Sequence, residues 1–286
     1  MKFFVNLPLS WVYRDEFWLE QLFAHELNPE LGLDETSVNL PLEWHKKMAL
    51  RIAERGLRCS CHLPFFMVPP GTSDAREREQ SADILCRAAE IAAIYNAAHM
   101  IGHPAFREAQ DSDPTPGALS PGSDFGFNLC PSQQWLENSA AVWSRVMSVN
   151  HAPLFLENTH ESDPVPAITL LKYLPENAGG KRAAMCFDAG HWFCFSNGWR
   201  KNDLESWLGY IVPRLGHLHL HDNDGSDDQH IGLGKGGIPY PAIFTLLTRY
   251  GAKPTVTLEP HDLDSLAASL GWLRSNTEVR DWAARL

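Results

Sequence analysis

The chain has 286 residues, of which 44% are hydrophobic and 21% charged, a composition typical of a globular protein with a sizeable core. No apolar run approaches the roughly 20 residues that a membrane-spanning helix requires, which argues against a membrane-embedded protein. The formal net charge of -11 argues against a broad surface for polyanions such as nucleic acids, because phosphate binding draws on clustered Lys and Arg.

The first residues and the cysteines indicate a cytoplasmic protein. The start, MKFFVNLPLSW, lacks the apolar segment and small-residue cleavage site of a secretory signal. The six cysteines form no CxxC pair, and most lie in apolar surroundings, as reduced thiols do. We therefore expect a cytoplasmic location.

Strands and helices alternate along the first hundred residues. Short apolar runs predict strands, and apolar residues at helical spacing predict the helices between them. Gly56 ends the second long helix, since glycine readily adopts the left-handed conformation at a helix C-terminus. The predicted order is strand 3–7, helix 16–25, strand 31–33, helix 42–55, strand 57–62, helix 74–96 and strand 99–104.

The segment 105–131 interrupts this alternation. It is rich in Pro, Gly, Ser and Asp, and it is too long and too polar for an ordinary connection. After a barrel strand, such a segment is either a lid or binding loop or a disordered surface excursion. We expect it to lie over the mouth of the barrel.

The alternation then resumes and continues to the end of the chain. Eight strand-helix pairs with near-continuous apolar strands predict a (β/α)₈ TIM barrel. Nothing resembles a linker, so residues 1–286 are expected to form a single domain. The remaining predicted helices are 133–149, 166–173, 203–211, 240–250 and 263–275, and the remaining strands are 154–158, 184–188, 217–221 and 254–259.

The stretch 216–238, GHLHLHDNDGSDDQHIGLGKGGI, contains an unusual strand. His217, His219 and His221 alternate with leucines, and a period of two puts all three imidazoles on one face. Burying them in apolar packing would leave ring nitrogens without partners, which is unfavourable. We therefore expect this face to meet water, carboxylates or a metal. The alternative is a solvent-exposed polar edge strand.

Candidate ligands recur where the predicted strands end. In a barrel the carboxyl ends of all strands face one mouth, so groups from six strands would share one pocket. Singly, each has a structural alternative, such as a hydrogen-bonded structural histidine or a helix-capping glutamate. Their coincidence favours a metal site made of His62, His103, Glu157, Asp188, His191, His219, Asp228, His230 and Glu259.

The types of donor limit which ions fit this site. Imidazole and carboxylate without thiolate favour Zn, Mn, Fe, Co or Mg over soft metals. Nine groups exceed what one ion can use. Either the site holds two or three ions, or one ion takes about four ligands and the other side chains bind substrate protons and hydroxyls.

Seven short segments together carry a resemblance to a known family. They are CHLPF at 61–65, IGHP at 101–104, LEN at 156–158, DAGH at 188–191, HLHD at 219–222, DQHIGLGKGGI at 228–238 and TLEP at 257–260. In this order they resemble the xylose-isomerase-like TIM-barrel superfamily. It includes sugar isomerases and epimerases as well as the endonuclease IV family of abasic-site nucleases.

The two branches of this superfamily imply different uses of the same residues. By resemblance, the endonuclease branch binds three zinc ions with the nine residues named above, all of which are of the matching type here. The isomerase and epimerase branch is similar to a subset. In that branch Glu157, Asp188, His219 and Glu259 would hold one divalent ion, often Mn, and His191 would contact substrate.

The loops around the predicted mouth separate the branches. By resemblance, the endonuclease branch inserts an Arg into DNA and lines its groove with basic residues. Here residues 33–43 hold three acids and no Lys or Arg, and residues 105–131 hold four acids and one Arg. Phe65 suits the rim of a sugar site and equally an apolar wedge. Many epimerases of this type have an Arg shortly after the seventh strand, where this chain has residues 224–226, Asp-Gly-Ser.

Residues 232–237 formally match the dinucleotide-binding pattern GxGxxG. They follow a polar loop instead of a strand, so we expect no nucleotide cofactor. The glycines are better interpreted as shaping the loop that carries His230. Lys235 is a candidate contact for a substrate phosphate, although a solvated lysine is the commoner situation.

These observations lead to three functional hypotheses. The first is a divalent-metal-dependent isomerase or epimerase of a small sugar, sugar acid or polyol, in which Glu157 and Glu259 exchange a proton through an enediolate. His191 would act on the substrate with them. Further substrate contacts would come from His62, His103, Phe65, His230 and Lys235.

The second hypothesis is an endonuclease IV-like multinuclear zinc phosphoesterase, and the third is a catalytically silent metal or metabolite binder. The acidic loops make nucleic acid the less expected partner and a small carbohydrate the more expected one. Dimers are common among barrels of this kind, so a homodimer is an expectation as well.

Overall fold

The computed structural model describes residues 3–113, 115, 122–176 and 180–285. Within them, eight parallel strands pair in sequence order and close into a barrel, because β1 also pairs with β8. The predicted (β/α)₈ TIM barrel is thereby confirmed. The strands are β1 (Phe4–Pro8), β2 (Asn28–Gly32), β3 (Ser60–His62), β4 (Met100–Gly102), β5 (Leu154–Glu157), β6 (Ala183–Asp188), β7 (Leu215–Leu220) and β8 (Thr255–Leu258).

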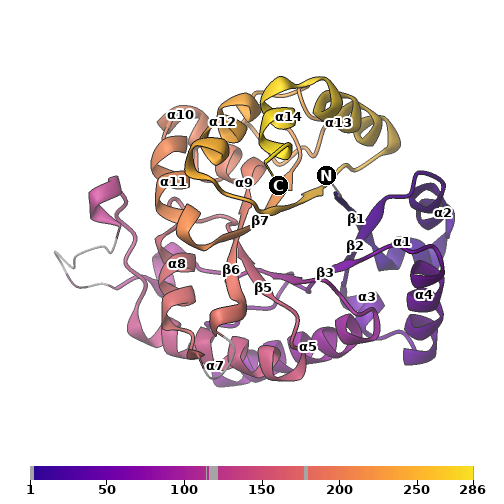
Figure 1. Cartoon of the computed structure of the whole chain (residues 1–286). Helices are drawn as coiled ribbons and strands as arrows, with labels where there is room; N and C mark the ends of the chain where they lie inside the picture. The colour runs from indigo at the N-terminus through magenta and orange to yellow at the C-terminus, as the bar shows by residue number, and fades with distance from the viewer. Residues whose placement is uncertain (1–2, 114, 116–121, 177–179, 286) are drawn as a thin grey trace.

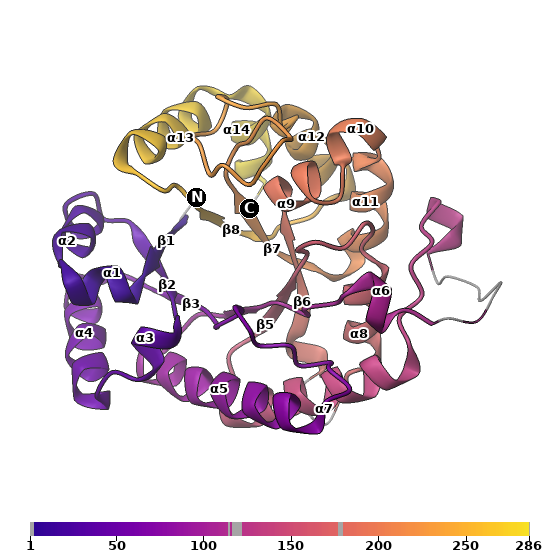
Figure 2. The same ribbon diagram turned by 180° about the vertical axis from the view of Figure 1, so that it is seen from behind.

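Helices surround the barrel and cover its outer face (Figure 1 and Figure 2). The long ones are α2 (Phe17–Ala24), α4 (Leu42–Glu54), α5 (Ala75–Ile94), α7 (Gln133–Val149), α8 (Val165–Tyr173), α11 (Leu204–Ile211), α12 (Tyr240–Tyr250) and α13 (Leu263–Ser275). The shorter ones are α1 (Leu9–Arg14), α3 (Glu35–Val38), α6 (Glu108–Asp111), α9 (Ala189–Cys194), α10 (Gly198–Lys201) and α14 (Thr277–Ala283), with 3₁₀ turns η1 (Ser123–Phe125), η3 (Gly180–Arg182) and η4 (Val212–Arg214).

The strands are buried on both faces, which explains their apolar composition. On β7 Leu218 and Leu220 are fully buried and belong to the core between barrel and helices, while the imidazoles of His217 and His219 are fully buried on the other face. The period-two interpretation of this strand therefore holds, and the exposed edge strand is excluded by barrel closure.

Strand register sets the layers of the barrel interior. Asp188 is level with His219 across the β6–β7 pair, and His219 is level with Thr257 across the β7–β8 pair. Glu30 is level with Ser60 across the β2–β3 pair. These alignments create two stacked layers of polar side chains, a deep one around Glu30 and an upper one at the carboxyl ends of the strands.

The sequence patterns did not predict the short helices or the full length of β2. Residues 28–30, Asn-Pro-Glu, have the composition of a turn, yet they pair with β1 on one side, and Glu30 pairs with β3 on the other. Barrel pairing overrides the weak local strand preference. Asp188 precedes helix α9 as its N-cap, and its side chain accepts a hydrogen bond from the His191 backbone N–H. This capping contact, which periodicity does not reveal, starts the helix.

The described parts of segment 105–131 lie mainly on the flank of the barrel. Phe125 and Phe127 pack against Tyr210 of α11, and the backbone N–H groups of Asn128 and Leu129 donate to Asp163 just before α8. Figure 1 shows this segment beside α8 and α11. Among the described residues of this segment, Ala105 lines the cavity at the mouth. Residues 114 and 116–121, part of the expected lid, lie outside the described residues.

In the described part of the chain, no helix combines the length and apolarity needed to cross a bilayer.

Candidate metal centre

A cavity of about 650 Å³ opens at the carboxyl ends of the strands. Seven of the nine predicted ligands line it, and the other two, Asp188 and His219, are fully buried beneath them. Phe65 also lines the cavity. Lys235 is exposed and is not among the described lining residues, so the structure does not bring this predicted substrate contact to the site.

Glu157, the last residue of β5, lies at the centre of the first group of ligands. Its Oε2 is 3.1 Å from Nε2 of His62, 3.3 Å from Nε2 of His103 and 3.2 Å from Nδ1 of His219. The carboxylate is 1% exposed. Glu157 thus faces imidazoles from β3, the end of β4 and β7 at once.

A second group surrounds His219 on the other side of Glu157. Nδ1 of His219 is 3.3 Å from Oε1 of Glu259 and 3.8 Å from Oδ2 of Asp188. Glu259 follows β8, and Asp188 ends β6. Four strands therefore contribute Glu157, Asp188, His219 and Glu259 to one set of neighbouring ligand atoms.

A third group forms around Asp228, on the loop that follows β7. Its Oδ2 is 3.4 Å from Nε2 of His191 and 3.0 Å from Nε2 of His230. His230 adopts a positive φ of 50°, which turns the loop so that the ring faces the cavity. The three groups together contain all nine predicted ligands.

Backbone carbonyls orient three of the imidazoles. Nδ1 of His62 is 3.0 Å from the Leu63 carbonyl, Nδ1 of His191 is 2.9 Å from the Asn158 carbonyl, and Nδ1 of His230 is 2.8 Å from the Glu259 carbonyl. A carbonyl only accepts, so each Nδ1 carries a proton, and each ring is turned with its Nε2 toward the mouth. Metal-binding histidines are usually oriented in this way.

The mouth fits a divalent metal. Buried atoms without an aligned hydrogen bond among the described residues include Nε2 of His103, Nδ1 of His219, Oδ2 of Asp188 and Oδ1 of Asp228. Buried polar atoms rarely stay without partners. The imidazole-to-carboxylate spacings range from 3.0 to 3.8 Å, and most lie near the distance of about 3.3 Å between ligand atoms in a tetrahedral site with bonds of about 2.0 Å.

Electrostatics differentiate the two glutamates. Burial raises the pKa of Glu157, but the imidazoles of His219 and His103 outweigh burial and hold its pKa well below the usual range. Burial also raises the pKa of Glu259, and there His219 offsets only part of the effect, so the pKa stays raised. Burial lowers the pKa of His103 to about 4 despite Glu157, which leaves a neutral imidazole suited to a metal.

Beneath the mouth lies a second polar layer that the sequence interpretation did not assign to the site. Glu30 accepts hydrogen bonds of 2.8 Å from the hydroxyls of Ser60 and Thr257. Its Oε1 lies 2.9 Å from Nε2 of His219, a contact without hydrogen-bond alignment. His219 therefore connects the layers, with Nε2 facing Glu30 and Nδ1 facing the mouth. The turn-like Asn-Pro-Glu sequence provided no signal for Glu30.

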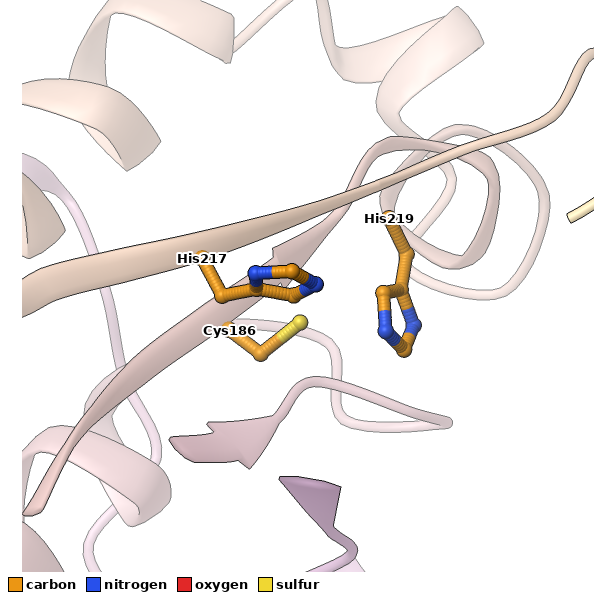
Figure 3. A group of neighbouring side chains, drawn as sticks. All are labelled: Cys186, His217 and His219. Atoms are coloured by element: carbon orange, nitrogen blue, oxygen red, sulfur yellow. The ribbon is translucent and has the colours of Figure 1, made fainter. Parts of the chain in front are cut away.

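Figure 3 shows Cys186 of β6 beside His217 and His219 of β7. Their ligand atoms lie within 4.8 Å of one another, as do those of Glu30, His99 and His217. However, His217 already contacts hydroxyls through both ring nitrogens, Thr255 at 2.6 Å and Thr257 at 2.9 Å. Burial raises the pKa of the Cys186 thiol well above its usual range, which disfavours a thiolate ligand. The deep layer is better described as a hydrogen-bonded support.

Comparison with known proteins gives this geometry a family context. The family model described as xylose isomerase-like TIM barrel matches residues 24–276. The uncharacterized protein MJ1311 of Methanocaldococcus jannaschii is 22% identical over 223 residues, which cover 76% of this chain and 69% of that protein.

Solved structures show the same architecture. The TTHB071 protein from Thermus thermophilus, soaked with ZnCl2, is 26% identical with a TM-score of 0.71, and the match covers 96% of this chain and 97% of that one. A D-tagatose 3-epimerase-like protein is 18% identical with a TM-score of 0.71, and the match covers 100% of this chain and 99% of that one. Because the family model matches most of the chain, the predicted relationship is confirmed, and this protein belongs to the xylose isomerase-like TIM barrel family.

Proposed function

We propose that this protein is a divalent-metal-dependent isomerase or epimerase of an uncharged sugar or polyol. The observation that carries the proposal is the pairing of Glu157 and Glu259, two buried carboxylates that both contact His219 at a cavity without Lys or Arg among its described lining residues. The cavity is large enough for a small sugar, and its rim is aromatic.

The opposite pKa shifts of the two glutamates support distinct roles in proton transfer. Glu157, whose pKa is lowered, is the carboxylate suited to accept a proton from carbon, and Glu259, whose pKa is raised, is suited to deliver one. Environments that push two carboxyl pKa values apart are typical of acid-base pairs. This arrangement supports removal of a proton from a carbon and its return either to the opposite face of the same carbon, as in an epimerase, or to the neighbouring carbon, as in an isomerase.

A divalent ion held by Glu157, Asp188, His219 and Glu259 would supply Lewis-acid polarisation of a substrate carbonyl, which acidifies the adjacent C–H. Around that set, His191 and His62 direct Nε2 toward the cavity, where each would form a hydrogen bond with a sugar hydroxyl. Phe65 stacks on the His103 ring with centroids 4.5 Å apart and offers an apolar surface to a sugar face.

The cavity lining favours an uncharged substrate. Apart from histidines, its described charged residues are acids, including Asp34 and Asp228 beside the two glutamates. A phosphorylated sugar would meet these carboxylates without a lysine or arginine to pair with its phosphate. The similar structures include an L-ribulose 3-epimerase, at 14% identity and a TM-score of 0.68, which supports testing neutral ketoses first.

Deuterium exchange tests the proposal directly. The metal-loaded protein should incorporate solvent deuterium next to the carbonyl of a neutral ketose, and Glu157→Gln should slow the exchange by roughly 100-fold or more. Glu259→Gln should slow it similarly, whereas Glu54→Gln on the exposed face of α4 should leave it unchanged. Normal exchange in both glutamate variants at the mouth would contradict the proposal.

The completeness of the ligand set favours a second candidate, the multinuclear phosphoesterase. All nine candidate ligands lie at the same mouth, and groups such as His62, His103 and Glu157 have ligand atoms within 4.8 Å of one another. The zinc-loaded protein should then hydrolyse bis(p-nitrophenyl) phosphate or nick abasic duplex DNA with a steep loss in salt. Hydrolysis without deuterium exchange would replace the first proposal with this one.

A further inference from the structure

His221, the residue after β7, has a buried ring without an aligned hydrogen bond to any described residue. It is 1% exposed, and neither ring nitrogen makes an aligned hydrogen bond within the described part of the chain. An imidazole removed from water without compensation destabilises the folded state. The backbone around it is fixed, because the Tyr240 hydroxyl donates to the His221 carbonyl. Both ring nitrogens of His221 therefore lack, among the described residues, the hydrogen bonds that would compensate for their burial.

Two aspartates face this ring. Nε2 of His221 is 3.3 Å from Oδ1 of Asp188 and 3.4 Å from Oδ1 of Asp228. Oδ1 of Asp228 also lacks an aligned hydrogen bond, and its other oxygen lies 3.0 Å from His230. The two distances from Nε2 of His221 to the aspartates exceed that of an ordinary hydrogen bond. They match the distance between two ligand atoms of one ion, about 3.3 Å.

Packing holds the His221 ring against these oxygens. A Cβ at position 190 would lie 1.9 Å from Cε1 of His221, so only glycine permits this approach. On the other face, the ring stacks on His230 with centroids 3.8 Å apart and planes 12° from parallel. The ring is thus confined in one orientation, with its Nε2 edge toward both aspartates.

We propose that His221 is a metal ligand in addition to the nine predicted ones and binds, through Nε2, a divalent ion shared with Asp188 and Asp228. This inference rests on the proposed metal-dependent function of the same cavity. Among the nine predicted ligands, Asp228 lies against His191 and His230. A ligand at 221 anchors the loop that carries Asp228 to the barrel wall formed by β6 and β7.

Zinc stoichiometry tests this role. Chelator-stripped protein is reloaded with Zn²⁺ alone, and bound zinc is measured by elemental analysis and by competition with a chelating dye. His221→Asn should lose one ion per chain or bind it about tenfold more weakly. His261→Asn is the matched control, because His261 stacks on the opposite face of His230 at 4.2 Å and should leave the count unchanged. An unchanged count and affinity in His221→Asn would overturn the inference.

Diffraction on the unmodified chain covers the case in which His221→Asn fails to fold. Crystals soaked in ZnCl2 should show an anomalous peak at the zinc edge about 2.0–2.1 Å from Nε2 of His221. Zinc at Glu157 with none at His221 would contradict this inference alone. Zinc at neither position would contradict the proposed metal-dependent function as well.

Discussion

His217 and His221 lie four residues apart along β7 and its extension, and both are buried, but their ring nitrogens have different surroundings. His217, in the deep layer, contacts the hydroxyls of Thr255 and Thr257 through its two nitrogens. His221, in the upper layer, has no aligned hydrogen bond among the described residues. The two histidines are equally buried but differ in chemistry. An imidazole with hydrogen bonds at both nitrogens stabilises the barrel, whereas one without them is a candidate ligand.

The carboxylates of the two layers repeat this contrast. Glu30 accepts hydrogen bonds from two hydroxyls at Oε2, and its Oε1 faces Nε2 of His219 without hydrogen-bond alignment. Glu157 is surrounded by the imidazoles of His62, His103 and His219. Both carboxylates lie near imidazoles, but hydroxyls donate to Oε2 of Glu30, whereas the described contacts of Glu157 are to imidazoles, which are the surroundings of a metal ligand. Four experiments, from the largest expected effect to the smallest, test how far the two layers differ in metal binding, stability and substrate binding.

The first experiment compares Glu157→Gln with Glu30→Gln. Glutamine keeps the size of each side chain and removes its charge. Glu157→Gln should weaken zinc binding by at least about 100-fold, because a direct ligand is lost, while Glu30→Gln should weaken it by about tenfold through His219 alone. Competition with a chelating dye measures both affinities. Equal losses would mean that the two layers do not differ in function.

The second experiment follows zinc affinity with pH. Burial lowers the pKa of His230, but Asp228 and Glu259 outweigh burial and raise it to about 9 in the metal-free chain. At pH 7 this ring is protonated, so zinc binding at Nε2 displaces a proton. Affinity should therefore rise by up to about tenfold per pH unit between about pH 7 and 9 and then level off.

Calorimetry in buffers of different ionisation enthalpy measures the released proton. His230→Asn should remove this contribution and flatten the slope. Zinc binding without proton release from the unmodified chain would show that His230 is no ligand.

The third experiment perturbs the deep layer with Thr257→Val, which removes a hydroxyl at similar volume. Glu30 and His217 would each lose a partner in the fully buried interior, so the free energy of unfolding should fall by about 1–3 kcal/mol. Urea unfolding of the metal-free chain measures this change, and the zinc count should not change. Thr255→Val is the control, since Thr255 is exposed and water can replace its hydroxyl. A lost zinc ion in Thr257→Val would place metal in the deep layer.

The smallest effect is expected at the rim, where the Phe66 side chain is 83% exposed beside the cavity. Phe66→Ala should leave the zinc count unchanged and raise KM for a neutral ketose by no more than about tenfold, because one aromatic contact contributes about 0.5–1.5 kcal/mol. Steady-state kinetics measures the change. A collapse of kcat with normal KM would give this ring a larger role than substrate contact.

Local patterns were sufficient for much of the fold. The long helices follow from apolar residues at helical spacing and seven of the eight strands from short apolar runs, and the helices 133–149, 240–250 and 263–275 have the bounds that the sequence predicts. The short helices at the mouth escaped prediction, because capping contacts such as that of Asp188 with the His191 backbone create them. β2 was only partly predicted, since its pairing with neighbours far along the chain outweighs its turn-like composition.

By itself, the sequence determined the barrel and the nine candidate ligands, because both depend on which residues end each strand and on a period that neighbouring residues share. Only the tertiary structure decided which ring nitrogens find partners. Glu30 reaches His219 from the opposite side of the barrel, and Gly190 lets the His221 ring approach Asp188 and Asp228. These contacts join residues distant in the chain, and hydrogen-bond satisfaction is a property of such contacts, which no local pattern contains.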